Sequence, residues 1–309
     1  MTAKPALVHR HGEDVRVLVA STGVELLRYV YRAEAAWEAP KPYIHPLRTL
    51  AGRTVTDYRP NDHRWHKGLS MTASHLSGQN LWGGNSYVHG EGYRPLPERV
   101  GSMAHTGFDE VSAREDGVTL TERLTWRPYT GEHWADELRR VEVHDIDPAG
   151  GSWALTWSSA VTNRRAEPLR FGSPATHGRT GAGYTGLFWR GPRAFRGGRV
   201  FSADGEGPEL KGQQSDWLAY TGEHDGFDGH ATVVMAHAPE NDHTGARGTH
   251  PAHWFVRNDS YAGMAPSFAF HEELVLDPGR TLERRYRVLI ADGAWERDRI
   301  EAALGAMAW

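Results

Sequence analysis

Short segments in which apolar and polar residues alternate dominate this chain. Clean alternation runs over residues 15–19, 118–126, 141–143, 153–157 and 282–290. A period of two is typical of a strand that buries one face and exposes the other. The 35 glycines and 17 prolines that punctuate these segments provide turns. The pattern therefore predicts an all-β protein, a large antiparallel β-sandwich.

The last part of the chain predicts two further elements. Residues 268–276 and 282–290 alternate on either side of Asp277-Pro-Gly279, which favours a β-hairpin. Apolar residues then repeat at helical spacing, which predicts a C-terminal helix against the sheet: Ile300, Ala303, Leu304 and Met307. Because no internal repeat or low-complexity linker interrupts the chain, we expect one β-sandwich domain over residues 1–309.

Composition excludes several classes of function. The formal net charge is −4 with the charges mixed throughout, which argues against a nucleic-acid partner. No run of 18 apolar residues occurs, so we expect no membrane partner. The absence of cysteine excludes disulfides and thiolate chemistry and fits a reducing compartment. Because no signal-peptide pattern opens the chain, we expect a cytoplasmic protein, and a homodimer stays open.

Polar groups are concentrated in residues 41–69, which carry His45, Arg48, His63 and His66 among aromatic residues and Pro or Gly breaks. Loops of this kind, mounted on rigid strands, are where chemistry is usually placed. We expect this segment to line a functional pocket. The alternative is a surface loop whose histidines bridge other loops.

Three charged residues occupy positions where alternation places the core face: Glu122, Glu272 and Arg284. An ionised group that is buried alone is costly, so each must be paired, neutralised or open to a cavity. One interpretation is an internal ion pair, for instance Glu272 with Arg284 across the hairpin. The other is a pocket in which a carboxylate of raised pKa acts as a general base.

Metal and nucleotide chemistry are weaker alternatives. His63 and His66 have an H-x-x-H spacing, and His45 could complete a three-nitrogen site like that of catalytic zinc. However, no adjacent Glu could serve as the base of such a site. The Gly-rich residues 178–186 lack the lysine of a phosphate-binding loop. We therefore predict no cofactor and no metal ligands.

Serine hydrolase chemistry is also disfavoured. No Gly-x-Ser-x-Gly motif occurs. Ser173 lies near His177 in the sequence, but Pro174 is incompatible with a strand-to-helix nucleophile elbow.

Residues 41–69, 178–190 and 250–261 resemble a family of soluble bacterial proteins labelled "methane oxygenase PmoA-like". The label itself names a membrane protein, which does not suit a chain without a membrane span. The resemblance implies a role in carbohydrate catabolism.

More distantly, the length and the strand-rich layout resemble the galactose mutarotase-like supersandwich. That resemblance implies a sugar site on a concave sheet, with an early Arg and His, a mid-chain His acid and a late Glu base. Arg48, His66, His177 and Glu272 match this order. The mutarotase-type motif around the mid-chain histidine is absent at His177.

These arguments lead to a carbohydrate-active enzyme as the first hypothesis, an epimerase, lyase, hydratase or hydrolase. It would act by acid–base chemistry on a small-molecule sugar or oxidised (keto) sugar, with Glu272 as base and His177 or His66 as acid. The expected substrate-binding residues are His45, Arg48, His63, Trp82, Asn85, Tyr184 and Arg257. A non-catalytic sugar-binding protein and a His-ligated metal enzyme are the alternatives.

Overall fold

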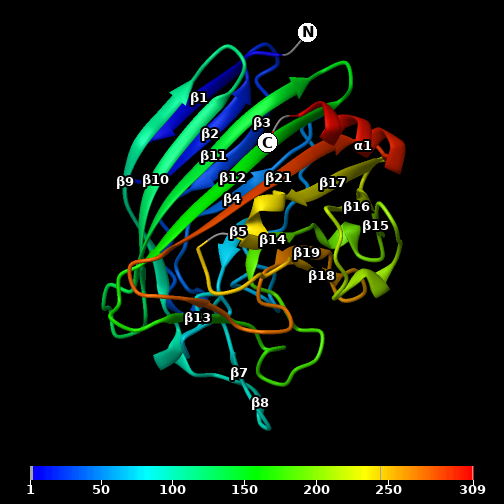
Figure 1. Ribbon diagram of the computed structural model, residues 1–309. Coiled ribbons are helices and arrows are strands. Elements are labelled where there is room, and N and C mark those ends of the chain that lie inside the picture. Colours follow the sequence, from blue (N-terminus) through cyan, green and yellow to red (C-terminus); the bar gives the residue numbers. More distant parts are fainter. Residues whose placement is uncertain (1–2, 244, 308) are drawn as a thin grey trace.

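The computed structural model describes residues 3–243, 245–307 and 309. Within them, antiparallel strands form most of the regular structure (Figure 1). The described residues contain two sheets of eight strands, one of three and one of two. The prediction of an all-β antiparallel fold with a C-terminal helix is confirmed.

In sheet order, the first large sheet comprises β1 (Pro5–Arg10), β2 (Asp14–Val19), β3 (Glu25–Val30), β4 (Tyr43–Leu47), β5 (Leu69–Thr72), β14 (Gly186–Arg190), β19 (Gly263–Ser267) and β18 (His253–Arg257). The second comprises β15 (Arg199–Ser202), β16 (Trp217–Glu223), β17 (His230–His237), β21 (Thr281–Asp292), β12 (Ser152–Asn163), β11 (Ala135–Asp147), β10 (Val118–Arg127) and β9 (Ser102–Ala113).

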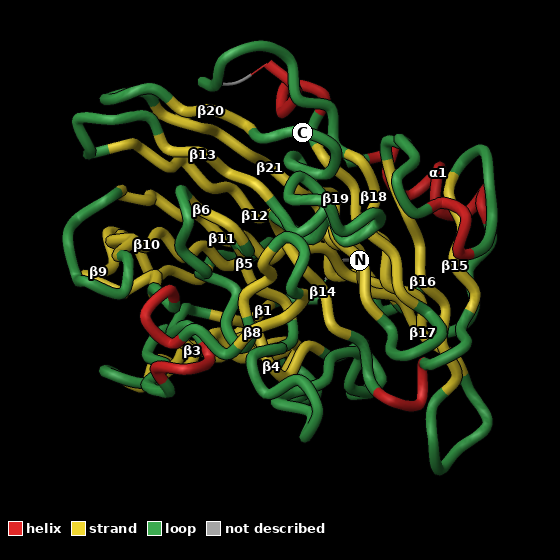
Figure 2. The backbone as a smooth tube through the Cα atoms, turned by 90° about the horizontal axis from the view of Figure 1, so that it is seen from below, coloured by secondary structure: helices red, strands yellow, loops and turns green. Residues whose placement is uncertain are grey.

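The three-stranded sheet has the order β20 (Leu274–Leu276), β13 (Leu169–Gly172) and β6 (His75–Leu76), and the smallest sheet is the hairpin of β7 (Ser86–Val88) and β8 (Gly92–Arg94). The helix α1 spans Arg297–Ala306. Single 3-10 turns lie between the strands (Figure 2): η1 (Ala36–Glu38), η2 (Pro97–Arg99), η3 (Arg193–Phe195), η4 (Pro208–Leu210) and η5 (Pro239–His243).

The main apolar core takes residues from both large sheets. Val15 and Leu27 of the first sheet share it with Leu120, Trp153 and Trp157 of the second. Each of these side chains is at most 2% exposed. Full burial of a large apolar side chain stabilises the fold by roughly 1.5–3 kcal/mol. The alternation read from the sequence therefore identifies the faces that hold the sheets together.

The predicted hairpin over 268–290 is wrong. Residues 268–272 form bends instead of a strand. β20 pairs with β13, whereas β21 pairs with β12 and β17. Phe268 belongs to the main core and Phe270 to a separate aromatic cluster. The alternation in this segment therefore reflects burial at two sites and not strand pairing.

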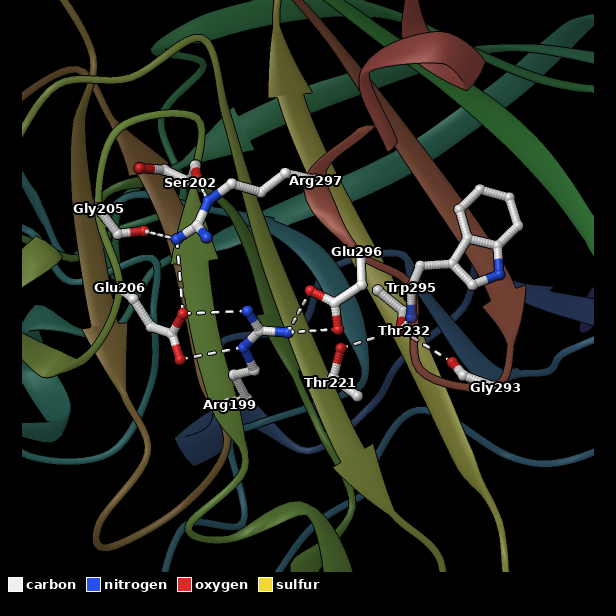
Figure 3. Close-up of polar contacts among 10 residues, drawn as sticks. All are labelled: Arg199, Ser202, Gly205, Glu206, Thr221, Thr232, Gly293, Trp295, Glu296 and Arg297. Atoms are coloured by element: carbon white, nitrogen blue, oxygen red, sulfur yellow. Dashed lines mark hydrogen bonds and ion pairs between the residues drawn. The ribbon is translucent and has the colours of Figure 1, made fainter. Parts of the chain in front are cut away.

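The C-terminal helix is held to the second sheet by its N-terminal end (Figure 3). Ile300 is buried there with Trp295. Arg199 of β15 contacts Glu206 at 3.0 Å and Glu296 at 2.8 Å. Arg297 donates to the carbonyl oxygens of Ser202 and Gly205. In the described part of the chain, no helix is both long and apolar enough to cross a membrane.

Glu122 is buried in the sandwich interior, where it is paired. It accepts hydrogen bonds from the Tyr29 hydroxyl and, at 2.6 Å, from His105 Nδ1. On the neighbouring strand, Arg139 forms two 2.8 Å bonds to Glu137. The interpretation that a charged residue on the core face is paired thus applies to Glu122, whose partners are Tyr29 and His105.

The interpretation of Glu272 and Arg284 as an internal ion pair is wrong. Glu272 is exposed in the bend before β20. Arg284 is 4% exposed, donates to the carbonyl oxygen of Asn241 and lies 5.1 Å over the ring of Phe268. The two side chains have separate surroundings because β20 and β21 pair with strands of different sheets.

Candidate functional site

A cavity of about 450 Å³ lies beside the β14, β19 and β18 end of the first large sheet. On β14, Leu187 and Trp189 enter the main core, while Phe188 between them joins an aromatic cluster. Phe255 of β18 belongs to the same cluster and lines the cavity. Since successive strand residues point to opposite faces, the cavity floor is the face turned away from the main core.

Loops from distant parts of the sequence provide the walls. They come from the segments before β5, between β6 and β7, between β13 and β14, and after β18. The lining residues are His63, Trp65, His66, Trp82, Asn85, Tyr93, Arg179, Tyr184, Phe255, Arg257, Ser260 and Tyr261.

The Trp82 loop is fixed by its backbone. Asn80 Oδ1 accepts hydrogen bonds from the N–H groups of Trp82 and Gly83, both at 2.9 Å. Gly84 has φ +67°, and a Cβ there would lie 2.5 Å from the ring of Trp65. A larger residue would displace this indole. The hydrogen bonds with Asn80 fix the backbone at Trp82, whose ring lies 5.3 Å from that of Tyr184.

His66 is a neutral group at the base of the cavity. It is 2% exposed, and burial lowers its pKa well below the usual value. Arg190 Nη1 lies 3.4 Å from His66 Nδ1. Because a guanidinium group can only donate, Nδ1 accepts and the imidazole proton resides on Nε2. His66 can therefore donate a hydrogen bond from Nε2.

His63 has the complementary arrangement. Its Nδ1 lies 3.3 Å from Asp62 Oδ2 without regular hydrogen-bond geometry. The nearby carboxylate favours the tautomer with the proton on Nδ1, which leaves Nε2 as a base. Burial lowers the pKa of His63, and Asp62 opposes this effect. The rings of His63 and His66 are 4.7 Å apart. One proton acceptor and one proton donor thus line the same cavity.

Two arginines at the cavity have no carboxylate partner within 4.0 Å among the described residues: Arg179 and Arg257. Arg179 lies 4.6 Å over the Tyr93 ring and donates to its hydroxyl. Arg257 lies near the Phe255 ring. Another hollow on the protein differs in this respect. It is lined by Arg140 and Glu142, and these two residues form a 2.9 Å ion pair.

The structure brings together six of the predicted site residues at this cavity and leaves four outside it. Those at the cavity are His63, His66, Trp82, Asn85, Tyr184 and Arg257. Outside it, His45 Nδ1 contacts Thr56 at 3.0 Å, and Arg48 forms a 2.6 Å ion pair with Glu25. The expectation that residues 41–69 converge as a whole is wrong, because the segment passes through β4 and then away from it.

His177 and Glu272, predicted as acid and base, are not partners. The neighbouring Glu273 lies 3.6 Å from His177. The donor atoms of His45, His63 and His66 do not form a close group, and the group of three donors within 4.8 Å of one another among the described residues is His75, His177 and Glu273. His177 Nδ1 bonds the carbonyl oxygen of Ser173, so the two residues do not form a nucleophile–base pair through the serine hydroxyl.

Sequence reasoning missed six cavity residues: Trp65, Tyr93, Arg179, Phe255, Ser260 and Tyr261. A signal existed for five of them, since Trp65 lies in the 41–69 stretch, Arg179 in the 178–190 stretch and the last three in the 250–261 stretch. All three stretches carried the family resemblance, but nothing in their spacing placed the last two beside residues 63–66.

The fold and site define an all-β protein with an aromatic cavity that bears two arginines. The chain belongs to a family described as "Family of unknown function (DUF6807)", whose match covers residues 16–305. No curated protein sequence matches the chain. The PmoA-like resemblance therefore stays a prediction.

Among solved structures, the chain is similar to a putative aldose 1-epimerase from Klebsiella pneumoniae, with 10% identity, coverage of 98% of this chain and 83% of that one, and a TM-score of 0.42. It is also similar to galactose 1-epimerase from Lactobacillus acidophilus, with 8% identity, coverage of 95% and 100%, and a TM-score of 0.39. An alpha-galactosidase from Lactobacillus brevis shows 11% identity, coverage of 94% and 40%, and a TM-score of 0.38. These likenesses are too distant to carry an argument about activity.

Proposed function

We propose that the cavity binds a small-molecule carbohydrate. The observation that carries this proposal is the combination of aromatic faces, such as those of Trp82 and Tyr184, with polar groups such as Asn85 and Ser260. A sugar ring has apolar C–H faces that pack on aromatic rings, and its hydroxyl edges need hydrogen-bond partners. A volume of about 450 Å³ suits a ligand of this size.

The unpaired arginines favour an acidic or oxidised sugar. Arg179 and Arg257 offer forked donors that match the geometry of a carboxylate. No Asp or Glu is among the twelve lining residues, so the two arginines are the charged side chains of the lining itself. A sugar acid bound there would supply the missing anion.

The two histidines support an acid–base reaction on this ligand. In the proposed step, His63 Nε2 removes a proton from a carbon next to a carbonyl group. The electron pair moves to the carbonyl oxygen, which His66 Nε2–H stabilises by a hydrogen bond. Protonation of the opposite face by water, with release of the first proton from the His63 imidazolium to solvent, gives epimerisation. Loss of a β-substituent that takes the proton from the His63 imidazolium gives lysis.

Binding is tested by calorimetric titration with a panel of neutral aldoses and sugar acids. We expect a sugar acid to bind, and Trp82→Ala to weaken its binding at least tenfold. Tyr129→Ala is the control, because Tyr129 is 58% exposed and does not line the cavity. Equal affinity in all three proteins, or no binding by any member of the panel, would reject the proposal.

A non-catalytic sugar-binding protein is the second candidate, favoured by the absence of a carboxylate from the lining. Exchange of a sugar C–H for deuterium in D₂O, followed by NMR, separates the two. An enzyme should catalyse exchange, and His63→Gln should slow it about 10²–10⁴-fold while binding persists. Binding without exchange would identify a binding protein.

A further inference from the structure

Outside the cavity, three potential metal ligands are brought together by the small sheet of β20, β13 and β6. His75 on β6 pairs with Gly172 at the end of β13. Glu273 immediately precedes β20, whose Leu274 pairs with Phe171 of β13. His177 lies in the turn that follows β13. The sheet therefore joins residues that are about a hundred positions apart in the sequence.

The donor atoms are spaced for a single ion. His177 Nε2 lies 3.6 Å and His75 Nδ1 lies 4.0 Å from Glu273 Oε1. All three donor atoms lie within 4.8 Å of one another. Two ligand atoms on a tetrahedral zinc ion are about 3.4 Å apart, given bonds of about 2.0–2.2 Å. The rings of His75 and His177 lie 3.7 Å apart at an interplanar angle of 34°, so binding of one ion requires at least one imidazole to rotate.

The tautomer of His177 is already set for coordination. Its Nδ1 lies 3.0 Å from the carbonyl oxygen of Ser173, which can only accept. The ring proton is therefore on Nδ1, and Nε2 presents its lone pair to Glu273. A backbone carbonyl that orients the second nitrogen is the usual companion of a metal-binding histidine.

His75 supplies an independent sign of a ligand. Its Nδ1 is buried and has no hydrogen-bond partner among the described residues. Such an atom is costly unless something satisfies it.

A void of about 10 Å³, room for about one water, adjoins His75 and His177. Beside Glu273, the absence of a side chain at Gly172 leaves space, because a Cβ there would lie 3.2 Å from Glu273 Oε1. Arg170 lies 3.6 Å from Glu273 Oε2. Arg170 and Arg99, which lines the void, are the cations that oppose a bound ion.

We propose that His75 Nδ1, His177 Nε2 and the Glu273 carboxylate bind one divalent transition-metal ion of the zinc class, with water at the remaining position. Two imidazoles and one carboxylate are a ligand set of catalytic zinc and of other first-row ions, and they leave an open coordination position. This proposal uses no residue of the aromatic cavity and stands independently of the carbohydrate proposal.

The test uses the full chain after treatment with a chelator and its removal. Zn²⁺ and Co²⁺ are titrated by calorimetry, and the Co²⁺ ligand-field spectrum and the melting temperature are recorded. We expect one equivalent to bind, with a tetrahedral Co²⁺ spectrum and a raised melting temperature. His177→Ala and Glu273→Gln should each weaken binding at least 100-fold, whereas Glu272→Gln, an exposed neighbour, should leave it unchanged.

The absence of stoichiometric binding by the unaltered chain would overturn the proposal. So would binding that persists in both variants, since it would then come from other histidines. If Glu273→Gln fails to fold, as judged by circular dichroism, His75→Gln takes its place and is expected to abolish the Co²⁺ spectrum. An unchanged spectrum in a folded His75→Gln protein would also reject the site.

Discussion

The buried cluster around Arg139 and the cavity around His66 both place polar groups on faces of otherwise apolar strands, but they differ in how these groups are paired. In the interior, Glu137 holds Arg139 by two 2.8 Å bonds and also accepts hydrogen bonds from Trp126 and Ser159. At the cavity, Arg179 and Arg257 have no carboxylate within 4.0 Å among the described residues. The interior charges are balanced within their own cluster, whereas the two cavity arginines are not balanced by a neighbouring carboxylate.

The pKa values of buried arginines also differ between the interior cluster and the cavity. Burial lowers the pKa of Arg139, but the attraction of Glu137 and its neighbours outweighs this and raises it overall. For Arg190, behind the cavity, burial dominates and the pKa is lowered despite Tyr261 and Asp57. A charged residue on an apolar strand face can therefore belong to a structural ion pair or lie at a cavity, and its partners distinguish the two cases.

The largest loss of stability is expected when Glu137, the carboxylate at the centre of the interior cluster, is removed. This change tests the comparison most strongly. Glu137→Ala leaves the Arg139 guanidinium buried without its carboxylate, because Glu137 and Arg139 are each 1% exposed. We expect the free energy of unfolding to fall by about 3–5 kcal/mol. Urea denaturation measures this loss.

A matched control lies on the same strand. Glu142 of β11 pairs with Arg140 at 2.9 Å, but both side chains are partly exposed. Glu142→Ala should cost less than about 1 kcal/mol. Similar losses in the two variants would mean that burial does not distinguish the interior cluster.

The sequence predicted the strands better than it predicted the site. Residues 118–126 alternate because one face enters the core, and the structure has strand β10 at this position. The same reasoning placed Glu272 in phase with Phe270 and Leu274, yet the chain bends there, and Glu273 takes the position beside His177.

Pairing over long distances was beyond sequence reasoning. His75, His177 and Glu273 meet only because β6 and β20 both pair with β13. No local pattern encodes these pairings. Trp82 and Tyr184 could be predicted because aromatic residues in Gly-rich loops are themselves an informative combination.

A second prediction concerns His45 and tests whether the functional site ends before β4. Burial lowers its pKa from 6.5 to about 4. As the pH falls from about 6.5 to about 4, the unfolded chain therefore binds this proton before the folded protein does. Stability from neutral His45 is complete above pH 6.5 and is lost across this interval, by at most about 1.4 kcal/mol per pH unit.

His45→Gln removes this titration, so its free energy of unfolding should decline less steeply across the same interval. Urea denaturation at several pH values compares the two slopes. Carbohydrate affinity should stay unchanged, since His45 does not line the cavity. A loss of affinity would show that the functional site extends to β4.

The smallest effect is expected where ion pairs are exposed, at the N-terminal end of α1. Glu296 is 68% exposed and contacts Arg199, which keeps Glu206 as a second partner (Figure 3). Solvent screens such pairs, so Glu296→Ala should lower the free energy of unfolding by only about 0.2–1 kcal/mol. Thermal and urea unfolding measure this change, and Glu301→Ala, an exposed change within the helix, is the control. A loss as large as that for Glu137→Ala would show that connectivity, not burial, makes a charge cluster structural, and the contrast between interior and surface would fail.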